Sequence, residues 1–440
     1  MFDLSSKFKK FYDEEVVLPS TETQKLRNKK KINIDRLKAG LEEYNEENNT
    51  TYKIAETREQ GSVAMATVTQ NDSNDYDIDV AIIFDKDNID GIGHIKIKNI
   101  IVDALKRKCT NFKTEPEALK NCVRIVYNDG YHIDFAIYRK SIDDDGNEIY
   151  EHAGSTQWQE RNPAAINNWF NEEIKEKGDG LRKTIRLSKM FCKSRNSWNM
   201  PGGLIQTVIC DEVFEESDRL DEMFYNNMCA VRDRLNESIE VNNPTDTEKS
   251  LLLKKKDEDE MNNWKKRLSD KITKLDILFE NDCTENDAKN AWYDFFKHDY
   301  WIDSSEEFCI DYDDTTQNIE DMFDLNVCYS LELECTITAN GFRPKFLKDF
   351  LKEYKWIPHR KKLSFSVSYT TAPYDCDIYW KVRNMGYEAI KRNCVRGQII
   401  KTNKKTQVEH SSFRGRHYVE CYFVRNGQVV AMSHIDVPIE

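Results

Sequence analysis

The clearest alternation of apolar and polar positions lies in residues 77–84, DIDVAIIF. Side chains on a strand point alternately to its two faces, so this pattern predicts a strand with one apolar face. That face comprises Ile78, Val80, Ile82 and Phe84. Asp77 and Asp79 share the opposite face. Because carboxylates are costly to bury at the edge of a strand, this pair indicates chemistry rather than packing.

Residues 123–138, VRIVYNDGYHIDFAIY, predict two strands joined by a turn, since Asp-Gly between β-rich segments favours a hairpin. The apolar face of the second strand comprises Tyr131, Ile133, Phe135 and Ile137. Asp134 lies on the other face beside His132, which we expect to be structural or to line a cleft. If this strand pairs beside the first, Asp134 joins Asp77 and Asp79 in a cluster of three carboxylates.

Helical spacing dominates the middle of the chain. Residues 20–45 predict a helix whose basic face, around Lys30, is interpreted as solvated surface. Asn-Pro and Pro-Gly pairs precede predicted helices between 160 and 230, and residues 235–300 predict charged surface helices. Gly and Asn break the last 110 residues into β-rich segments, which predict a separate all-β domain at about 328–440. The pattern as a whole predicts an α+β fold.

The three aspartates and a glycine-serine pair point to phosphate chemistry. Clustered carboxylates repel one another unless cations neutralise them, and Mg²⁺ prefers oxygen ligands. Two such ions can hold the attacking and leaving oxygens of a phosphoryl displacement. Gly61 would let the backbone approach a phosphate, and the Ser62 hydroxyl can donate a hydrogen bond. This combination predicts metal-dependent phosphoryl or nucleotidyl transfer; the alternative is an exposed acidic loop without a metal.

Four basic residues recur at helical spacing downstream. They are Arg182, Arg186, Lys189 and Lys193, and they form one stripe on a predicted helix. If this stripe faces the acids, it can hold triphosphate oxygens. For Arg182 and Lys193 we favour the interpretation of a solvated surface.

Composition and charge narrow the possible partners. The net charge of −13 and the pI near 5.3 argue against stable nucleic-acid binding and against a long RNA substrate. The 12 cysteines form no C-x-x-C pair, so a structural zinc site is not indicated. No apolar segment approaches the roughly 20 residues of a membrane helix, and the N-terminus lacks a signal-peptide core. We expect a cytoplasmic protein with reduced thiols and no membrane partner.

Several segments resemble the CD-NTase family, the cGAS/DncV-like nucleotidyltransferases. These segments are QGSVAMAT (60–67), DYDIDVAIIF (75–84), YHIDFAIY (131–138) and IRLSKMFCKSRN with MPGGLIQTVI (185–209). The resemblance covers roughly residues 20–300. It implies a polymerase-β-like fold with two lobes, shared with 2'-5' oligoadenylate synthases. A catalytic lobe with an N-terminal spine helix would span residues 1–160, and a helical nucleotide-binding lobe would span 161–327.

The same resemblance implies a role for each candidate site residue. Two Mg²⁺ ions, which Mn²⁺ can replace, would bind Asp77, Asp79 and Asp134. Asp134 would also help to activate the attacking hydroxyl. The residues implied to contact the nucleotide triphosphate are Gln60, Gly61, Ser62 and Lys189. Gly202 and Gly203 stand where relatives often carry a base-stacking or hydroxyl residue.

The end of the chain resembles the AGS-C domain, a sensor-like module found behind such nucleotidyltransferases. The resemblance is carried by residues 380–399 and 413–439 and implies that 328–440 form this domain. The segment mixes aromatic and basic residues at Trp380, Arg383, Asn384, Arg396, Gly397, Arg414, Gly415, His417 and Tyr418. They could form a site for a nucleotide or polyanion, or they could be ordinary β-sandwich structure with a basic rim.

The resemblance implies a cyclic oligonucleotide synthase. It would condense nucleoside triphosphates (ATP, GTP or others) into a cyclic di- or trinucleotide second messenger and release pyrophosphate. The product would activate a separate effector in bacterial anti-phage (CBASS) signalling. Two alternatives stay open: a nucleotidyltransferase that modifies a protein or RNA acceptor, and a nucleotide sensor with weak catalysis.

Overall fold

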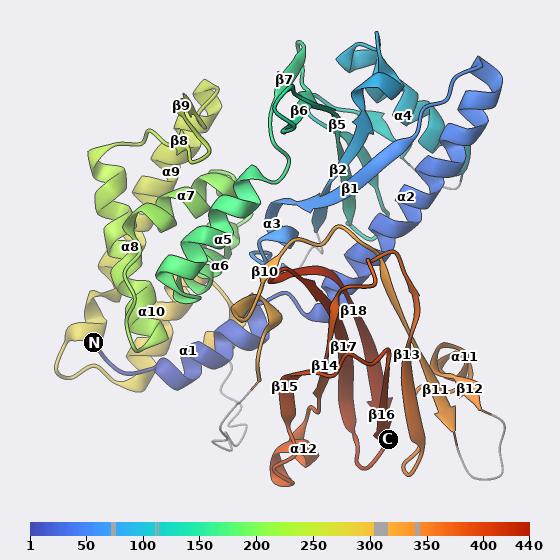
Figure 1. Ribbon diagram of the computed structural model, residues 1–440. Coiled ribbons are helices and arrows are strands. Elements are labelled where there is room, and N and C mark those ends of the chain that lie inside the picture. Colours follow the sequence, from blue (N-terminus) through green and yellow to red (C-terminus); the bar gives the residue numbers. More distant parts are fainter. Residues whose placement is uncertain (72–75, 111, 113, 303–315, 339–343) are drawn as a thin grey trace.

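The computed structural model describes residues 1–71, 76–110, 112, 114–302, 316–338 and 344–440. Figure 1 shows three groups of elements: a mixed sheet with its covering helices at the upper right, a helical group at the left, and a β-sandwich below the sheet. The sheet and the helical group give the two-lobed arrangement of the predicted fold.

The mixed sheet has the strand order β1-β2-β5-β4-β3, with β6 beside β5 and β7 beside β6. Its strands are β1 (Ile54–Gln60), β2 (Asp77–Asp85), β3 (Glu117–Ala118), β4 (Val123–Val126), β5 (His132–Ile142), β6 (Glu148–Ala153) and β7 (Trp158–Glu160). β2 and β5 run parallel, with Asp79 opposite Asp134. β4 and β5 form the predicted antiparallel hairpin. The expected pairing of the two acid-bearing strands is therefore confirmed.

Helices α2 (Ser20–Asn48) and α4 (His94–Lys108) cover the apolar face of this sheet. Ile82 and Ile137 are fully buried there, and such burial contributes about 2 kcal/mol per isoleucine. The two helices cross closely, because a Cβ on Gly40 would lie 1.9 Å from the Ala104 carbonyl oxygen. The prediction that the basic face of α2 is solvated is wrong at Lys30. The ammonium of Lys30 lies 2.7 Å from the buried Glu59 carboxylate.

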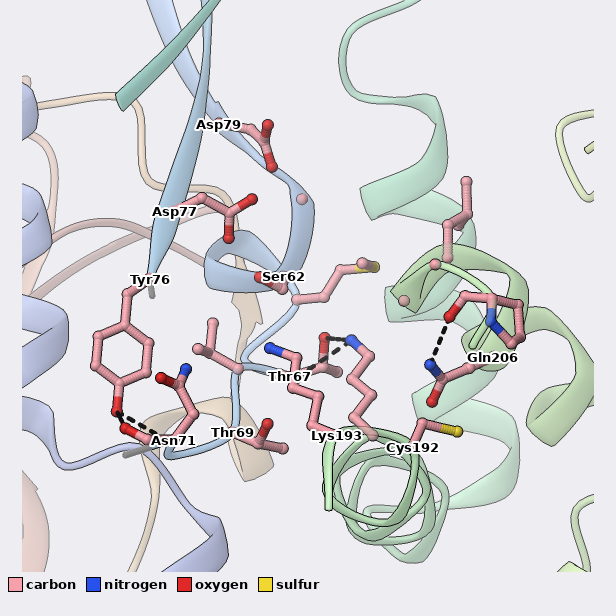
Figure 2. A pocket seen from close by; sticks show the side chains of 18 of the residues that line it. Ser62, Thr67, Thr69, Asn71, Tyr76, Asp77, Asp79, Cys192, Lys193 and Gln206 are labelled. Carbon is pink, nitrogen blue, oxygen red and sulfur yellow. Dashed lines mark hydrogen bonds between the residues drawn. The ribbon is translucent and has the colours of Figure 1, made fainter. Parts of the chain in front are cut away.

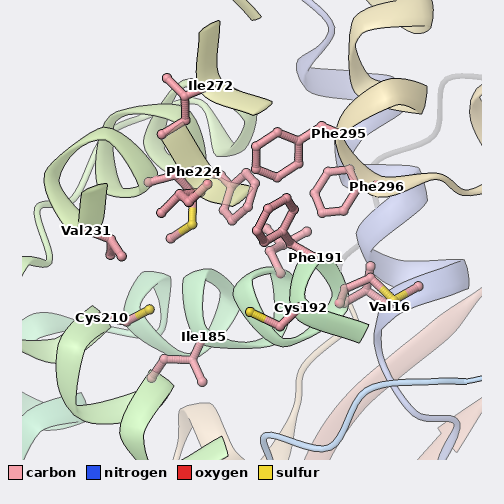
Figure 3. Close-up of a cluster of buried hydrophobic side chains, with 14 of the residues drawn as sticks. Val16, Ile185, Phe191, Cys192, Cys210, Phe224, Val231, Ile272, Phe295 and Phe296 are labelled. Carbon is pink, nitrogen blue, oxygen red and sulfur yellow. The ribbon is translucent and has the colours of Figure 1, made fainter. Parts of the chain in front are cut away.

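The helical group packs around an aromatic core (Figure 3). Its helices are α5 (Ala165–Lys177), α6 (Gly180–Lys193), α7 (Gly203–Val213), α8 (Leu220–Glu237), α9 (Lys255–Ile272) and α10 (Glu285–Phe296). The N-terminal α1 (Ser5–Phe11) and η1 (Tyr12–Val16) also bury their side chains in this core. A hairpin of β8 (Asn242–Asn243) and β9 (Asp246–Ser250) interrupts the segment expected to be wholly helical. The Asn243 side chain accepts the Thr245 N–H and so stabilises the turn.

The C-terminal region is rich in strands, as predicted, and it forms a sandwich of two sheets. One sheet has the order β10-β18-β17-β14-β15 and the other β12-β11-β13-β16. Their strands are β10 (Asp324–Leu325), β11 (Leu331–Thr338), β12 (Lys345–Phe346), β13 (Lys362–Thr370), β14 (Asp377–Arg383), β15 (Arg396–Lys401), β16 (Thr406–His410), β17 (Gly415–Arg425) and β18 (Gln428–Ile439). The prediction of an all-β domain is incomplete, because the region also contains two short helices, α11 (Leu347–Glu353) and α12 (Tyr387–Lys391). Trp380 lies in the sandwich core and its indole donates to the Lys404 carbonyl, so its role is structural.

The outer face of the β10–β18 sheet carries a group of charged residues next to α2, and all of them except Asp436 have buried side chains. Glu420 lies 3.3 Å from the Lys381 ammonium and 3.2 Å from His434 Nδ1, and Asp436 lies 3.0 Å from His434 Nε2. Burial alone would lower the pKa of His434, but the hydrogen bonds to Asp436 and Glu420 outweigh it and raise the pKa to about 9. His434 is therefore an imidazolium at neutral pH.

This raised pKa predicts a pH-dependent contribution to stability. Because the pKa of His434 is higher folded than unfolded, its contribution is full below about pH 6.5 and is lost as the pH rises through 9. We expect His434→Gln to lower the unfolding free energy by about 2 kcal/mol at pH 6.5 and by much less at pH 9.5. Thermal unfolding of both proteins at the two pH values measures this. An equal loss at both would contradict the prediction.

Candidate active site

A cavity of about 1190 Å³ lies between the mixed sheet and the helical group, and both line it. Figure 2 shows Asp77, Asp79 and Ser62 on the sheet side, with Lys193 and Gln206 on the helical side. Asp134 and Lys189 also line it. The folded chain thus brings the predicted acids, the glycine-serine pair and the basic helix to one cavity.

The three acids occupy one face at the end of the sheet where β2 and β5 begin. Asp77 is exposed and Asp134 is buried. Burial, and then the charges of Asp77 and Asp134, raise the pKa of Asp79 to about 7. The carboxylates are close enough to repel one another, so all three can ionise together only if a cation compensates them.

Arg124 is the site residue that sequence reasoning missed. Its Nε and Nη2 donate to the two carboxylate oxygens of Asp134, at 2.8 and 2.6 Å. The register of the predicted hairpin could have identified it, because Arg124 on β4 lies directly opposite Asp134 on β5. This bidentate pair supplies a positive charge to one of the three acids.

The arrangement of the acids differs from the expected shared metal site. Across the described ranges, no group of three His, Cys, Asp or Glu side chains is placed to hold one metal ion. Asp134 is bound to Arg124 instead, and Asp75, which begins the segment DYDIDVAIIF, lies outside the described residues. The donor chemistry nevertheless fits Mg²⁺, since these are carboxylate oxygens and the raised pKa of Asp79 shows that they lack full compensation.

Gly61 begins the short helix α3 (Gly61–Ala64) directly after β1. Its φ of +67° lies in the left-handed region, and a Cβ there would be 2.1 Å from Asp79 Oδ2. The glycine therefore lets the α3 turn pack against the Asp79 carboxylate. Beside it, the Gln60 side chain lines the cavity and donates to the Pro163 carbonyl at 2.6 Å, which ties β1 to the segment before α5.

Lys189 on α6 points into the wall of the cavity. Its ammonium donates to Thr67 Oγ1 at 2.8 Å and to the Thr67 carbonyl at 3.2 Å. Burial, and then the nearby Lys193 charge, lower the pKa of Lys189 to about 7. A Cβ on Gly203 would lie 3.1 Å from Lys189 Cε, so this glycine leaves space for the lysine stem. Nothing in the sequence singled out Thr67 as its partner.

The rest of the basic stripe divides between the interior and the surface. Arg182 and Arg186 are buried and donate to the carbonyls of Met65 and Ala66. The interpretation of Arg182 as solvated is therefore wrong, because helical spacing defines a face without showing what covers it. Lys193 is exposed, as predicted.

Two stretches of the chain match protein families. Residues 55–138 match the "Cyclic GMP-AMP synthase DncV-like, nucleotidyltransferase domain", and residues 313–440 match the "Adenylyl/Guanylyl and SMODS C-terminal sensor domain", AGS-C. The chain therefore contains a segment similar to a DncV-like nucleotidyltransferase domain, followed by one similar to an AGS-C domain. The matches indicate a nucleotidyltransferase of the DncV-like type with a C-terminal AGS-C domain.

One relative and two solved structures are similar to this chain. The cyclic GMP-AMP synthase of Escherichia albertii is 21% identical over 381 residues, which are 84% of this chain and 80% of that one. CdnC of E. coli MS115-1, solved with ATP, has a TM-score of 0.51 at 14% identity and covers 67% of this chain and 98% of its own. The apo form of Vibrio cholerae DncV has a TM-score of 0.51 at 18% identity, covering 64% and 90%. These likenesses confirm the predicted nucleotidyltransferase fold.

No helix within the described ranges is both long enough and apolar enough to cross a membrane.

Proposed function

We propose that this protein is a CD-NTase that condenses nucleoside triphosphates into a cyclic di- or trinucleotide. The observation that carries the proposal is the cavity that joins Asp77, Asp79 and Asp134 to Lys189 and the α3 turn. Its volume of about 1190 Å³ exceeds the roughly 300–1,000 Å³ of most small-ligand pockets, which suits a site for two nucleotides. The likeness to the E. albertii cyclic GMP-AMP synthase supports the same reaction.

In this proposal each residue has a role in nucleotidyl transfer. Ser62 and Lys189 bind phosphate oxygens of the donor, and Asp77, Asp79 and Asp134 would hold two Mg²⁺ ions. When bound, these ions stabilise the charge of the attacking and leaving oxygens. A ribose hydroxyl oxygen attacks the α-phosphorus, the bond to pyrophosphate breaks, and Asp134 accepts the hydroxyl proton once Arg124 has released it. A second transfer of the same kind closes the ring.

The proposal extends to the cellular role of the product. A cyclic nucleotide released into the cytoplasm would bind a separate effector protein, as expected for bacterial anti-phage (CBASS) signalling. The net charge of −13 also supports small-molecule substrates over a nucleic acid.

The test is to incubate the pure protein with mixed nucleoside triphosphates and Mg²⁺ or Mn²⁺. We expect a phosphatase-resistant product whose mass identifies the bases and the ring size. Label transferred to protein or RNA would support the acceptor-modifying alternative. If wild-type protein gave no product under any activating condition, the proposal would fail.

The lowered pKa of Lys189 predicts how the affinity for ATP depends on pH. Because this pKa is about 7, only the protonated fraction can pair with the triphosphate, and that fraction falls as the pH rises. We expect ATP affinity, measured by calorimetry in EDTA, to weaken about fivefold between pH 7 and pH 8. EDTA is needed because Asp79, whose pKa is also about 7, deprotonates over the same range and would bind Mg²⁺ and ATP more tightly as the pH rises.

Two variants isolate the lysine. Lys189→Arg stays charged throughout this range, so its affinity should change far less with pH, and Lys189→Met should bind weakly at both values. Wild type and Lys189→Arg share the titration of ATP itself, so the difference between them reports Lys189. Identical pH profiles for these two proteins would contradict the assigned role.

A further inference from the structure

The segment after α3, residues 65–69, is held by two buried arginines of α6. Arg182 Nε donates to the Met65 carbonyl at 3.3 Å, and Arg186 Nε donates to the Ala66 carbonyl at 2.8 Å. Ala66 has a φ of +51°, a left-handed conformation that is uncommon for a residue other than glycine. The surrounding contacts must therefore hold this backbone in place.

The AGS-C domain holds the same arginines from the other side. Glu320 Oε1 lies 3.4 Å from Arg186 Nη2, and Asp321 Oδ1 lies 3.8 Å from Arg182 Nη1. Both acids belong to η5 (Ile319–Asp321), inside the stretch that matches AGS-C. Charges buried this deeply persist only when they are paired. Arg182 also has Asp179 at 2.5 Å, whereas the acid that pairs with Arg186 is Glu320.

An apolar contact joins the same surfaces. Ala66 packs against a cluster on the outer face of the β10–β18 sheet. The buried members of this cluster are Ile319, Leu325, Ile399, Tyr422, Val424 and Val429. The segment after α3 is thus enclosed between α6 and the AGS-C domain.

This segment connects directly to the groups proposed to bind phosphate. The Thr67 N–H donates to the Ser62 carbonyl at 2.8 Å, and the Thr67 hydroxyl accepts from Lys189. A displacement of Ala66 therefore moves both Ser62 and the partner of Lys189. A short path thus leads from Glu320 in η5 through Arg186 and the Ala66 backbone to Thr67 at the cavity.

We propose that the AGS-C domain regulates donor binding by holding this segment through Arg182, Arg186 and Glu320. These three are positioning residues, and the inference rests on the proposed nucleotidyl transfer. A ligand or partner that displaces η5 from α6 would release the Met65–Thr67 backbone and weaken the affinity for nucleoside triphosphate. The reverse change, tightening η5 against α6, would strengthen it.

The test compares Glu320→Gln with Asp324→Asn in the full chain. Asp324 also joins the AGS-C region to the helical group, through Lys175 at 2.6 Å, whereas the contact of Glu320 is with an arginine that holds residues 65–69. Both changes remove one negative charge from the same interface. We expect Glu320→Gln to speed amide exchange in a peptide covering 61–71 and to raise the Kd for ATP by about fivefold, and Asp324→Asn to change neither. Glu320→Asp, which keeps the charge but shortens the side chain, should give an intermediate effect.

The outcomes separate this inference from the proposed reaction. Unchanged exchange in folded Glu320→Gln and Glu320→Asp would overturn the inference, as would faster exchange without weaker ATP binding. Equal effects in the Asp324→Asn control would also overturn it, since any loosening of the interface would then suffice. Neither exchange nor ATP binding requires turnover, so a wild-type protein that makes no product would defeat the proposed reaction alone.

Discussion

Replacing Asp134 with Ala is expected to lower kcat/KM for cyclic nucleotide synthesis by about 10²- to 10⁴-fold. The change removes both a proposed metal ligand and the group proposed to accept the hydroxyl proton. The fold should survive, because the Arg124 side chain freed by the change is about one-third exposed and can be solvated. Steady-state product formation measures the effect, and thermal unfolding verifies that the protein is folded.

Asp85→Asn is the matched control for this experiment. Asp85 is an exposed aspartate at the opposite end of β2, away from the cavity, so its neutralisation should leave kcat/KM within about twofold. Asp77→Ala should behave like Asp134→Ala, since both acids serve the same proposed metal ions. If Asp134→Ala retained a tenth or more of wild-type activity, its assignment as a catalytic acid would be wrong.

Replacing Gly61 with Ala is expected to reduce kcat/KM by about 10²-fold. The new Cβ would lie 2.1 Å from Asp79 Oδ2, so either the carboxylate or the α3 turn must move. The left-handed φ of +67° adds about 1–2 kcal/mol of backbone strain for a residue with a side chain. Steady-state kinetics measures the first effect and thermal unfolding the second.

Gly91→Ala is the control that separates the backbone strain of a positive φ from the steric clash with Asp79. Gly91 has nearly the same φ, +70°, but no atom lies within 4 Å of the position that a Cβ would take there. We expect the two variants to lose similar stability and only Gly61→Ala to lose activity. Equal activity in the two variants would show that the packing of the α3 turn against Asp79 is unimportant for the reaction.

Much of the geometry of the candidate site could be predicted from local sequence. Period-two alternation placed Asp77 and Asp79 on one face of β2, and the same rule placed Asp134 on the corresponding face of β5. Parallel pairing then brings Asp79 opposite Asp134. Helix-start signals likewise predicted α5 and α7, because a cap or a proline acts within one turn of the helix.

The sequence by itself determined the order of the elements, the face on which each acid lies and the β-rich end of the chain. These features depend on residues that are only a few positions apart. The tertiary structure alone decided what each charged group meets. Arg124 binds Asp134, Lys189 binds Thr67, and Arg186 meets Glu320, 134 residues away along the chain. Periodicity gives the direction of a side chain, but burial and pairing depend on surfaces that only folding brings together.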